Sequence, residues 1–127
     1  MYQVRIQRSF CAAHALRLPD GTSEPMHGHN FHVDVRIASE SLDELETVVD
    51  FHWLEQAIDP ILAPAQNADL NAIAPFAGPD GQLRINPSAE RIAWWIGTEV
   101  AAVLPGHLTL HSVEVTEAPG CSAIYLP

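Results

Sequence analysis

Three histidines fall within six positions, at His27, His29 and His32, in the segment "EPMHGHNFHVDVRI" of residues 24–37. Successive side chains of a β-strand point to opposite faces, so on a strand His27 and His29 would share one face and His32 would lie on the other. Two imidazoles on one face, with a glycine between them that permits close backbone approach, suit a single metal ion. The spacing therefore predicts a metal site, although surface histidines are the alternative for an isolated H-G-H motif.

A further histidine, His14, ends another alternating segment, residues 2–14, in which most even positions are apolar. On a strand it would close that apolar row, just as His27 and His29 begin the apolar row of residues 27–38. Three neutral imidazole ligands suit Zn²⁺ and leave its fourth tetrahedral position open, as in catalytic zinc sites. We therefore predict zinc bound by these three residues. The other histidines show no ligand spacing and are predicted to be structural or surface residues: His32, His52, His107 and His111.

The rest of the chain predicts the elements that position these side chains. Strands are expected over residues 2–14, 27–38, about 108–117 and the C-terminal segment "SAIYL". One helix is expected to begin after an N-cap at Asp50 and to kink or end at Pro60. A second is expected to begin around Asn86-Pro87-Ser88, with proline near the first helical position, and to stop at Pro105-Gly106. Strands followed by helices and then strands favour an antiparallel α+β fold over a doubly wound sheet.

Composition limits the class of protein. A chain of 127 residues with 47% hydrophobic residues suits a single domain over residues 1–127. The net charge of −10, with six lysines and arginines and no basic cluster, disfavours nucleic acid as a partner. No apolar run is long enough to span a membrane, and the N-terminal segment alternates where a signal peptide would be apolar. Cys11 and Cys121 do not resemble a disulfide framework, so a cytoplasmic location is expected.

Glu117 is a second candidate for chemistry. It follows Val113 and Val115 on the same face of a predicted strand, so its carboxylate is expected to point inward. Two carboxylate oxygens could accept paired N–H donors from the edge of a heterocycle. A frayed strand end that exposes Glu117 to solvent is the alternative.

Several motifs occur in the order and spacing of one enzyme family: "FCAAH", "HGHNFHV", "VVDF", "LN", "NPSAERIAWWI" and "VEVTEAPGCSAIY". Over nearly its whole length the chain resembles the 6-pyruvoyltetrahydropterin synthase and 6-carboxytetrahydropterin synthase family. The resemblance implies zinc ligation by His14, His27 and His29. It also implies that Glu117 anchors the amino-pyrimidine edge of a pterin substrate and that Ser88 helps to hold the pterin.

The same resemblance implies the tunnelling fold, an α+β fold in which a four-stranded antiparallel sheet carries two helices on one face. In this family the sheets of several subunits join into a barrel. We therefore expect a homo-oligomer, a trimer or a hexamer, with active sites between subunits.

The chain departs from the family pattern at the proton-transfer residues. The common synthases carry a cysteine shortly before H-G-H, whereas here the loop "GTSEPMHGH" has no cysteine. They also carry an Asp-His pair before L-N, whereas here Gln66 and Asn67 stand at those two positions. Glu24 falls in an E-x-x-H-G-H pattern like that of a variant class that uses glutamate in place of cysteine. That class resembles an enzyme that converts 7,8-dihydroneopterin triphosphate to 6-hydroxymethyl-7,8-dihydropterin. A carboxylate beside zinc could accept a proton from a substrate hydroxyl, so Glu24 is predicted to be a general base; an ordinary acidic loop residue is the alternative.

Three functions remain open at this point. The first is a zinc-dependent lyase that acts on a dihydropterin side chain with Glu24 as general base. The second is the ordinary activity, which forms 6-carboxytetrahydropterin or 6-pyruvoyltetrahydropterin, and the absence of the cysteine and of the Asp-His pair argues against it. The third is a zinc- and pterin-binding protein without turnover, which Gln66 and Asn67 favour.

Overall fold

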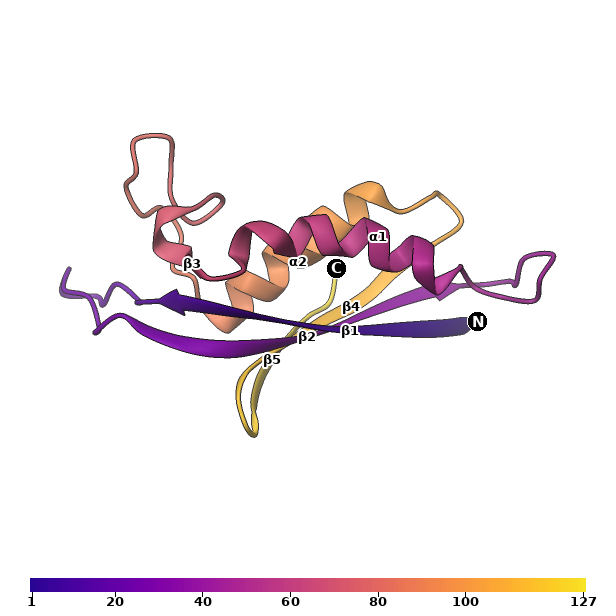
Figure 1. The fold of residues 1–127 in the computed structure, drawn as a ribbon, viewed down its shortest axis with the longest axis horizontal. Coiled ribbons are helices and arrows are strands. Elements are labelled where there is room, and N and C mark those ends of the chain that lie inside the picture. Colours follow the sequence, from indigo (N-terminus) through magenta and orange to yellow (C-terminus); the bar gives the residue numbers. More distant parts are fainter.

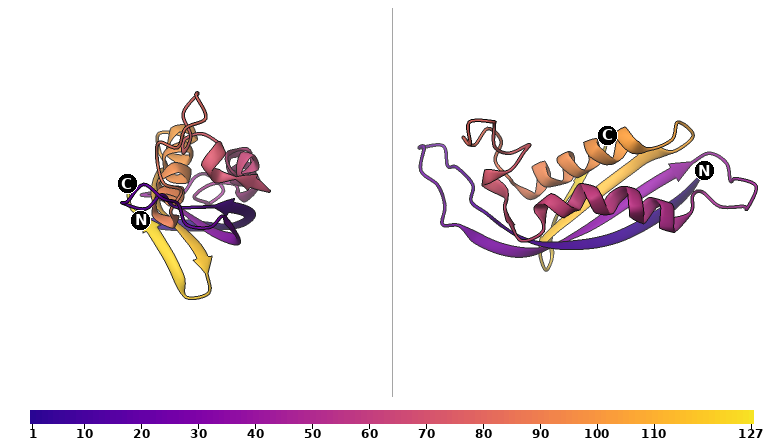
Figure 2. Two further views of the ribbon diagram at one scale, coloured as in Figure 1. Left: turned by 90° about the vertical axis from the view of Figure 1, so that its left-hand side faces the viewer. Right: turned by 45° about the horizontal axis from the view of Figure 1, so that its top comes forward.

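The computed structural model describes residues 1–127 as a sheet covered on one side by two α-helices (Figure 1). The strands are β1 (Tyr2–His14), β2 (His27–Ser39), β3 (Ala68–Asp69), β4 (Thr109–Ala118) and β5 (Cys121–Tyr125). The helices are α1 (Phe51–Leu62) and α2 (Ala89–Val103), with short 3₁₀ turns at Ala63–Ala65 and Leu70–Ala72. Figure 2 shows both α-helices on the same side of the sheet, while the turn between β4 and β5 projects to the other side.

The sheet has the order β3-β1-β2-β4-β5, so it contains five strands where four were expected. The four expected strands are all present, and their pairings are antiparallel. The additional strand, β3, pairs in parallel with β1 at only two positions, through Ala12 and Ala13. Two residues are too few for an alternating pattern, which is why the sequence did not predict β3.

The register of β1 and β2 positions the three histidines. The antiparallel pairing places His14 opposite His27 and Ala12 opposite His29. Directly opposite side chains in such a pair have Cβ atoms about 4.5–5.5 Å apart, so the imidazoles must lie close together. Farther along the same face the side chains are buried under the helices, as the alternation predicted: Ile6, Phe10, Phe31, Val33, Val35 and Ile37.

The helices begin close to where their capping residues predict. The Asp50 carboxylate accepts a hydrogen bond of 2.9 Å from the His52 N–H, which confirms Asp50 as the N-cap of α1. Pro60 does not end α1, which continues to Leu62 before it passes into a 3₁₀ turn. Pro87 is not in the first turn of α2, because Ser88 is the N-cap and its Oγ accepts from the Arg91 N–H. Neither helix has the length and apolar character needed to cross a membrane.

Gly97 allows the C-terminal strand β5 to pack closely on α2. A Cβ atom at this position would lie 2.5 Å from Cδ1 of Tyr125. Gly97→Ala is therefore expected to lower the free energy of unfolding by about 1–3 kcal/mol, measured by urea denaturation, through overpacking. In a Tyr125→Ala background the same change should be neutral or stabilising, since alanine is favoured over glycine in a helix by about 1 kcal/mol. An equal loss in both backgrounds would contradict the proposed contact.

Candidate functional site

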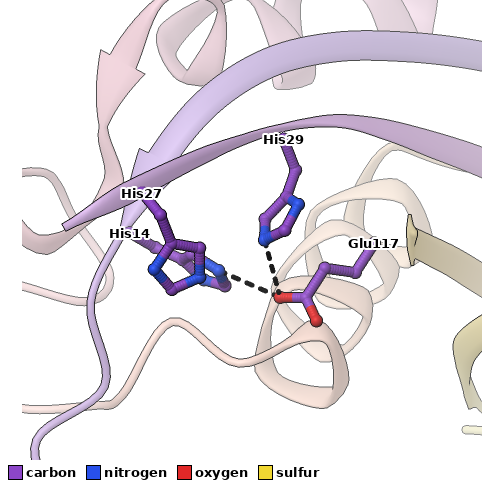
Figure 3. Close-up of side chains that lie close together, drawn as sticks. All are labelled: His14, His27, His29 and Glu117. Atoms are coloured by element: carbon purple, nitrogen blue, oxygen red, sulfur yellow. Dashed lines mark ion pairs between the residues drawn. The ribbon is translucent and has the colours of Figure 1, made fainter. Parts of the chain in front are cut away.

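Four side chains from three neighbouring strands converge at one end of the sheet (Figure 3). His14 is the last residue of β1, His27 and His29 begin β2, and Glu117 lies near the end of β4. Their ligand atoms all lie within 4.8 Å of one another. The structure therefore brings together the three predicted zinc ligands and the predicted inward-pointing carboxylate.

Backbone carbonyl groups fix the orientation of two of the imidazoles. Nδ1 of His14 lies 2.7 Å from the Pro87 carbonyl oxygen, and Nδ1 of His27 lies 2.8 Å from the Pro25 carbonyl oxygen. Because a carbonyl oxygen only accepts hydrogen bonds, we assign the proton of each neutral ring to Nδ1. Each Nε2 then presents a lone pair to the centre of the cluster. This arrangement is typical of metal-binding histidines, whose second ring nitrogen is usually held by such a partner.

The centre of the cluster fits a cation. Nε2 of His14 and Nε2 of His29 are buried and have no hydrogen-bond partner. Oε1 of Glu117 lies 2.9 Å from the first and 3.7 Å from the second, without the geometry of a hydrogen bond. Lone pairs that face each other at this distance are unfavourable unless a positive charge lies among them. Three imidazole nitrogens and one carboxylate oxygen are donors that bind a metal ion, so His14, His27, His29 and Glu117 form a possible metal site.

Glu117 points inward, as its strand parity predicted, and its side chain is 31% exposed. Three histidine ligands were expected to leave the fourth position of the zinc ion free of protein atoms. Glu117 instead lies next to the histidines. Glu117 also lines a hollow of about 210 Å³ beside the cluster, together with Ser88, Glu90 and Cys121. The carboxylate is therefore within reach both of a metal ion and of a molecule in this hollow. Its role as a pterin anchor stays a prediction, as does that of Ser88.

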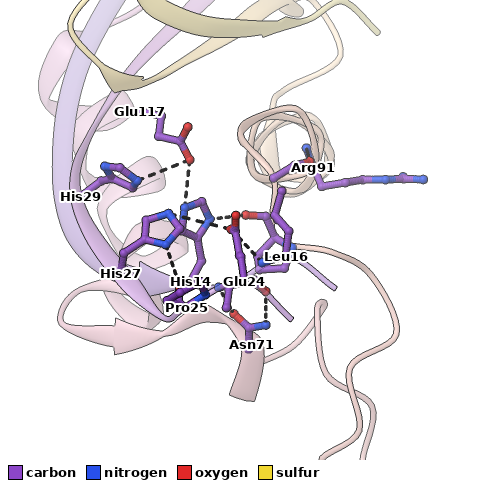
Figure 4. A network of polar contacts seen from close by, with 12 residues as sticks. His14, Leu16, Glu24, Pro25, His27, His29, Asn71, Arg91 and Glu117 are labelled. Atoms are coloured by element: carbon purple, nitrogen blue, oxygen red, sulfur yellow. Dashed lines mark hydrogen bonds and ion pairs between the residues drawn. The ribbon is translucent and has the colours of Figure 1, made fainter. Parts of the chain in front are cut away.

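Glu24 lies beside the cluster and is not directed into solvent. Its Oε1 accepts a hydrogen bond of 2.9 Å from the Leu16 N–H and lies 3.9 Å from Nε2 of His27. Figure 4 shows both contacts. The Glu24 N–H also donates to the Leu16 carbonyl, at 3.0 Å, so two hydrogen bonds to one residue hold it. The loop thus presents a carboxylate next to a candidate metal ligand, as the E-x-x-H-G-H pattern led us to expect.

Gln66 and Asn67 lie along the edge of β1 and form no hydrogen bond or ion pair with the histidines. Gln66 Oε1 accepts from the Cys11 N–H at 3.2 Å, and the Asn67 N–H donates to the Cys11 carbonyl at 2.6 Å. Asn67 has a φ of 57°, a conformation in which asparagine is enriched. Both residues therefore have structural contacts that account for their presence. The histidines without ligand spacing are exposed, as predicted: His32, His52, His107 and His111.

Sequence reasoning missed the groups that support these side chains. The Pro25 and Pro87 carbonyls orient two histidines, but a backbone carbonyl gives no signal in a sequence. Asn71, labelled in Figure 4, bonds to Ala15, and Asn86 bonds to Arg17, so both hold the segment that follows His14. Their only signals were the short motifs "LN" and "NPS", which gave no indication of a contact with residues 15–17.

Comparisons with known proteins agree with this fold. A model of the family "6-pyruvoyl tetrahydropterin synthase" matches residues 3–127. The chain is 30% identical over 109 residues to the dihydroneopterin monophosphate aldolase of Pyrococcus furiosus, which covers 86% of this chain and 83% of the relative. It is 33% identical over 130 residues to the 6-carboxy-5,6,7,8-tetrahydropterin synthase of Synechocystis, which covers 98% and 93%.

The fold also matches a solved structure, that of 6-pyruvoyl tetrahydropterin synthase from Caenorhabditis elegans. The TM-score is 0.79 at 21% identity, and the match covers 100% of this chain and 97% of the other. This likeness confirms the expected tunnelling fold. With the family match over residues 3–127, it follows that the chain belongs to the 6-pyruvoyl tetrahydropterin synthase family.

Proposed function

We propose that this protein is a zinc-dependent lyase that cleaves the side chain of a phosphorylated 7,8-dihydroneopterin. The observation that carries the proposal is the position of Glu24, whose Oε1 lies 3.9 Å from Nε2 of His27 in a loop without a cysteine. The name of the Pyrococcus furiosus relative, an aldolase of dihydroneopterin monophosphate, supports the same class of reaction. The His27 contact supports a role for Glu24 at the metal site, since a solvated acidic residue needs no such neighbour.

In this proposal His14, His27 and His29 hold zinc. Zinc supplies Lewis-acid chemistry, because it lowers the pKa of a hydroxyl group that binds it. Glu117 and Ser88 hold the pterin ring, an assignment supported by their place on the wall of the 210 Å³ hollow beside the histidines. The two oxygens of Glu117 would accept the paired N–H groups of the amino-pyrimidine edge.

Glu24 acts as the general base. It removes the proton from the hydroxyl group on the second carbon of the side chain, and the bond between the first and second carbons breaks. The second carbon leaves as an aldehyde, and the bonding electrons pass into the C=N bond of the dihydropterin ring. Return of a proton to the first carbon gives 6-hydroxymethyl-7,8-dihydropterin. Oε1 of Glu24 accepts the hydrogen bond from the Leu16 N–H, so Oε2 is the oxygen available for this proton transfer.

We also propose that residues 1–127 form a single pterin-binding domain that assembles into a trimer or hexamer. The outer edge of β5 has no partner strand, and β1 pairs with β3 at only two positions. Unpaired edges favour addition of a further strand, and a ring of subunits would close them. Both cysteines are free, which is consistent with a cytoplasmic location.

A second function, pterin binding without turnover, is favoured by Gln66 and Asn67. Both are engaged at the edge of β1, and neither side-chain amide can act as an acid or a base near neutral pH. The ordinary synthase activity draws support from the relative named 6-carboxy-5,6,7,8-tetrahydropterin synthase. The synthase would form a different pterin product from the lyase, and the binding protein would form none.

Product identification separates the three functions. Zinc-loaded protein is incubated with 7,8-dihydroneopterin monophosphate or triphosphate, and the pterins are identified by liquid chromatography and mass spectrometry. We expect 6-hydroxymethyl-7,8-dihydropterin with release of the phosphorylated two-carbon aldehyde. A 6-pyruvoyl or 6-carboxy product would support the synthase, and tight binding without any product would support the binding protein; either result would contradict the lyase.

A further inference from the structure

The segment of residues 15–17 continues the direction of β1 beyond His14, and two asparagine side chains take the place of a partner strand. The Asn71 amide accepts from the Ala15 N–H at 2.9 Å and donates to the Ala15 carbonyl at 2.6 Å. The Asn86 amide accepts from the Arg17 N–H at 2.7 Å and donates to the Arg17 carbonyl at 3.0 Å. Each asparagine therefore satisfies both backbone groups of one residue, as a neighbouring strand would.

Leu16 lies between these two residues and pairs with Glu24 instead. Its N–H donates to Oε1 of Glu24 at 2.9 Å, and its carbonyl accepts from the Glu24 N–H at 3.0 Å. In an extended segment the N–H groups of successive residues point to opposite edges. The asparagines thus hold one edge of the segment, and the Leu16 N–H points to the other edge, where residues 22–24 pair with residues 16–18 through the Arg17–Ser23 bridge and the Leu18 N–H bond to the Thr22 carbonyl.

We propose that Asn71 and Asn86 are positioning residues for the lyase reaction. They hold residues 15–17 so that the Leu16 N–H fixes one Glu24 oxygen near His27 and leaves the other oxygen for the substrate proton. This inference rests on the proposed function of Glu24 as general base. The two asparagines act through Leu16 and do not themselves touch the substrate.

Asn86 also links the base to the metal site. The next residue along the chain, Pro87, accepts the hydrogen bond from Nδ1 of His14 at 2.7 Å. The hydrogen bonds between Asn86 and Arg17 thus tie the loop that carries Glu24 to the segment that orients His14. Asn71 does not contact the segment that orients His14, but it bonds to Ala15, the residue directly after His14, so zinc content is measured in its variant to separate an effect on Glu24 from an effect on the metal site.

The test compares Asn71→Ala and Asn86→Ala with the matched control Gln82→Ala. Gln82 is an exposed amide in the loop before Asn86, and its side chain makes no hydrogen bond within the protein. In each asparagine variant kcat is expected to fall about tenfold or more, since small misplacements of a catalytic group have effects of this size. KM and zinc stoichiometry should stay within about twofold of the unmodified protein for Asn71→Ala, and Gln82→Ala should leave kcat unchanged. Asn71→Asp, which keeps the acceptor for the Ala15 N–H, should retain more activity than Asn71→Ala.

Two outcomes would overturn the inference. One is an unchanged kcat per zinc-loaded site in Asn71→Ala. A residue that only stabilises the fold would lower the melting temperature of this variant and leave its kcat unchanged. The other is unchanged hydrogen exchange at the Leu16 amide, which should become about tenfold faster in both asparagine variants and not in Gln82→Ala. The exchange measurement needs no substrate. If the unmodified protein cleaves no pterin, the proposed function fails and with it the catalytic part of this inference, while Leu16 exchange still decides whether the asparagines hold the segment.

Discussion

Replacement of His14 by alanine is expected to remove the bound metal and to abolish turnover. His14 is 1% exposed, and its Nε2 is a buried atom without a hydrogen-bond partner. Loss of a group that only orients a metal ligand lowers affinity about 10–100-fold, and loss of the ligand itself should exceed this. The measurement is zinc per protein chain by elemental analysis after dialysis, with the melting temperature recorded in the presence and absence of zinc. Since a metal ion that binds the folded state stabilises it, the stabilisation by zinc should disappear in this variant.

His111→Ala is the matched control for this change. It removes an imidazole from an exposed position of β4, and His111 is not among the clustered residues. Its zinc content and its stabilisation by zinc should equal those of the unmodified protein. An unchanged zinc content in His14→Ala would contradict the ligand assignment, because no histidine outside the cluster of His14, His27, His29 and Glu117 is placed to replace it.

Replacement of Glu24 by glutamine is expected to lower kcat by about 10²–10⁴-fold, the usual contribution of a general base. Glutamine keeps the size of the side chain and an oxygen that can accept from the Leu16 N–H, but it cannot take up a proton. Zinc content should be unchanged, because Glu24 lies outside the cluster of His14, His27, His29 and Glu117. Pterin affinity should also be retained, so the loss should fall on kcat with little change in KM.

Glu44→Gln is the control for the loss of a negative charge. Glu44 is exposed in the loop between β2 and α1, and its side chain forms no hydrogen bond or ion pair within the protein. The control should leave kcat unchanged. If Glu24→Gln retains full activity with a normal zinc content, Glu24 is an ordinary acidic loop residue and the base lies elsewhere.

Alternation of side chains along the strands predicted much of this site. The parity of His14, His27 and His29 placed three imidazoles on one face, and the register that pairs His14 with His27 confirms that placement. The same rule predicted that Glu117 points inward. It did not predict that Glu117 would lie 2.9 Å from His14, because β1 and β4 are separated by β2 in the sheet and the alternation within one strand does not give the distance between two strands.

The supporting contacts were not predictable because they join distant parts of the chain. Asn71 bonds to Ala15 across 56 residues, and Asn86 bonds to Arg17 across 69. A short motif shows that such a residue is present but not which backbone group it meets. The two-residue strand β3 and the continuation of α1 past Pro60 likewise depend on packing that no local pattern records.

The most direct test of the central claim is a comparison of zinc-loaded unmodified protein with zinc-loaded Glu24→Gln in the same assay with a phosphorylated 7,8-dihydroneopterin. We predict that the unmodified protein releases 6-hydroxymethyl-7,8-dihydropterin and that the variant, at equal zinc content, releases it at least about 100-fold more slowly. Equal rates for the two proteins, or no release by either one, would contradict a metal-dependent lyase with Glu24 as its base.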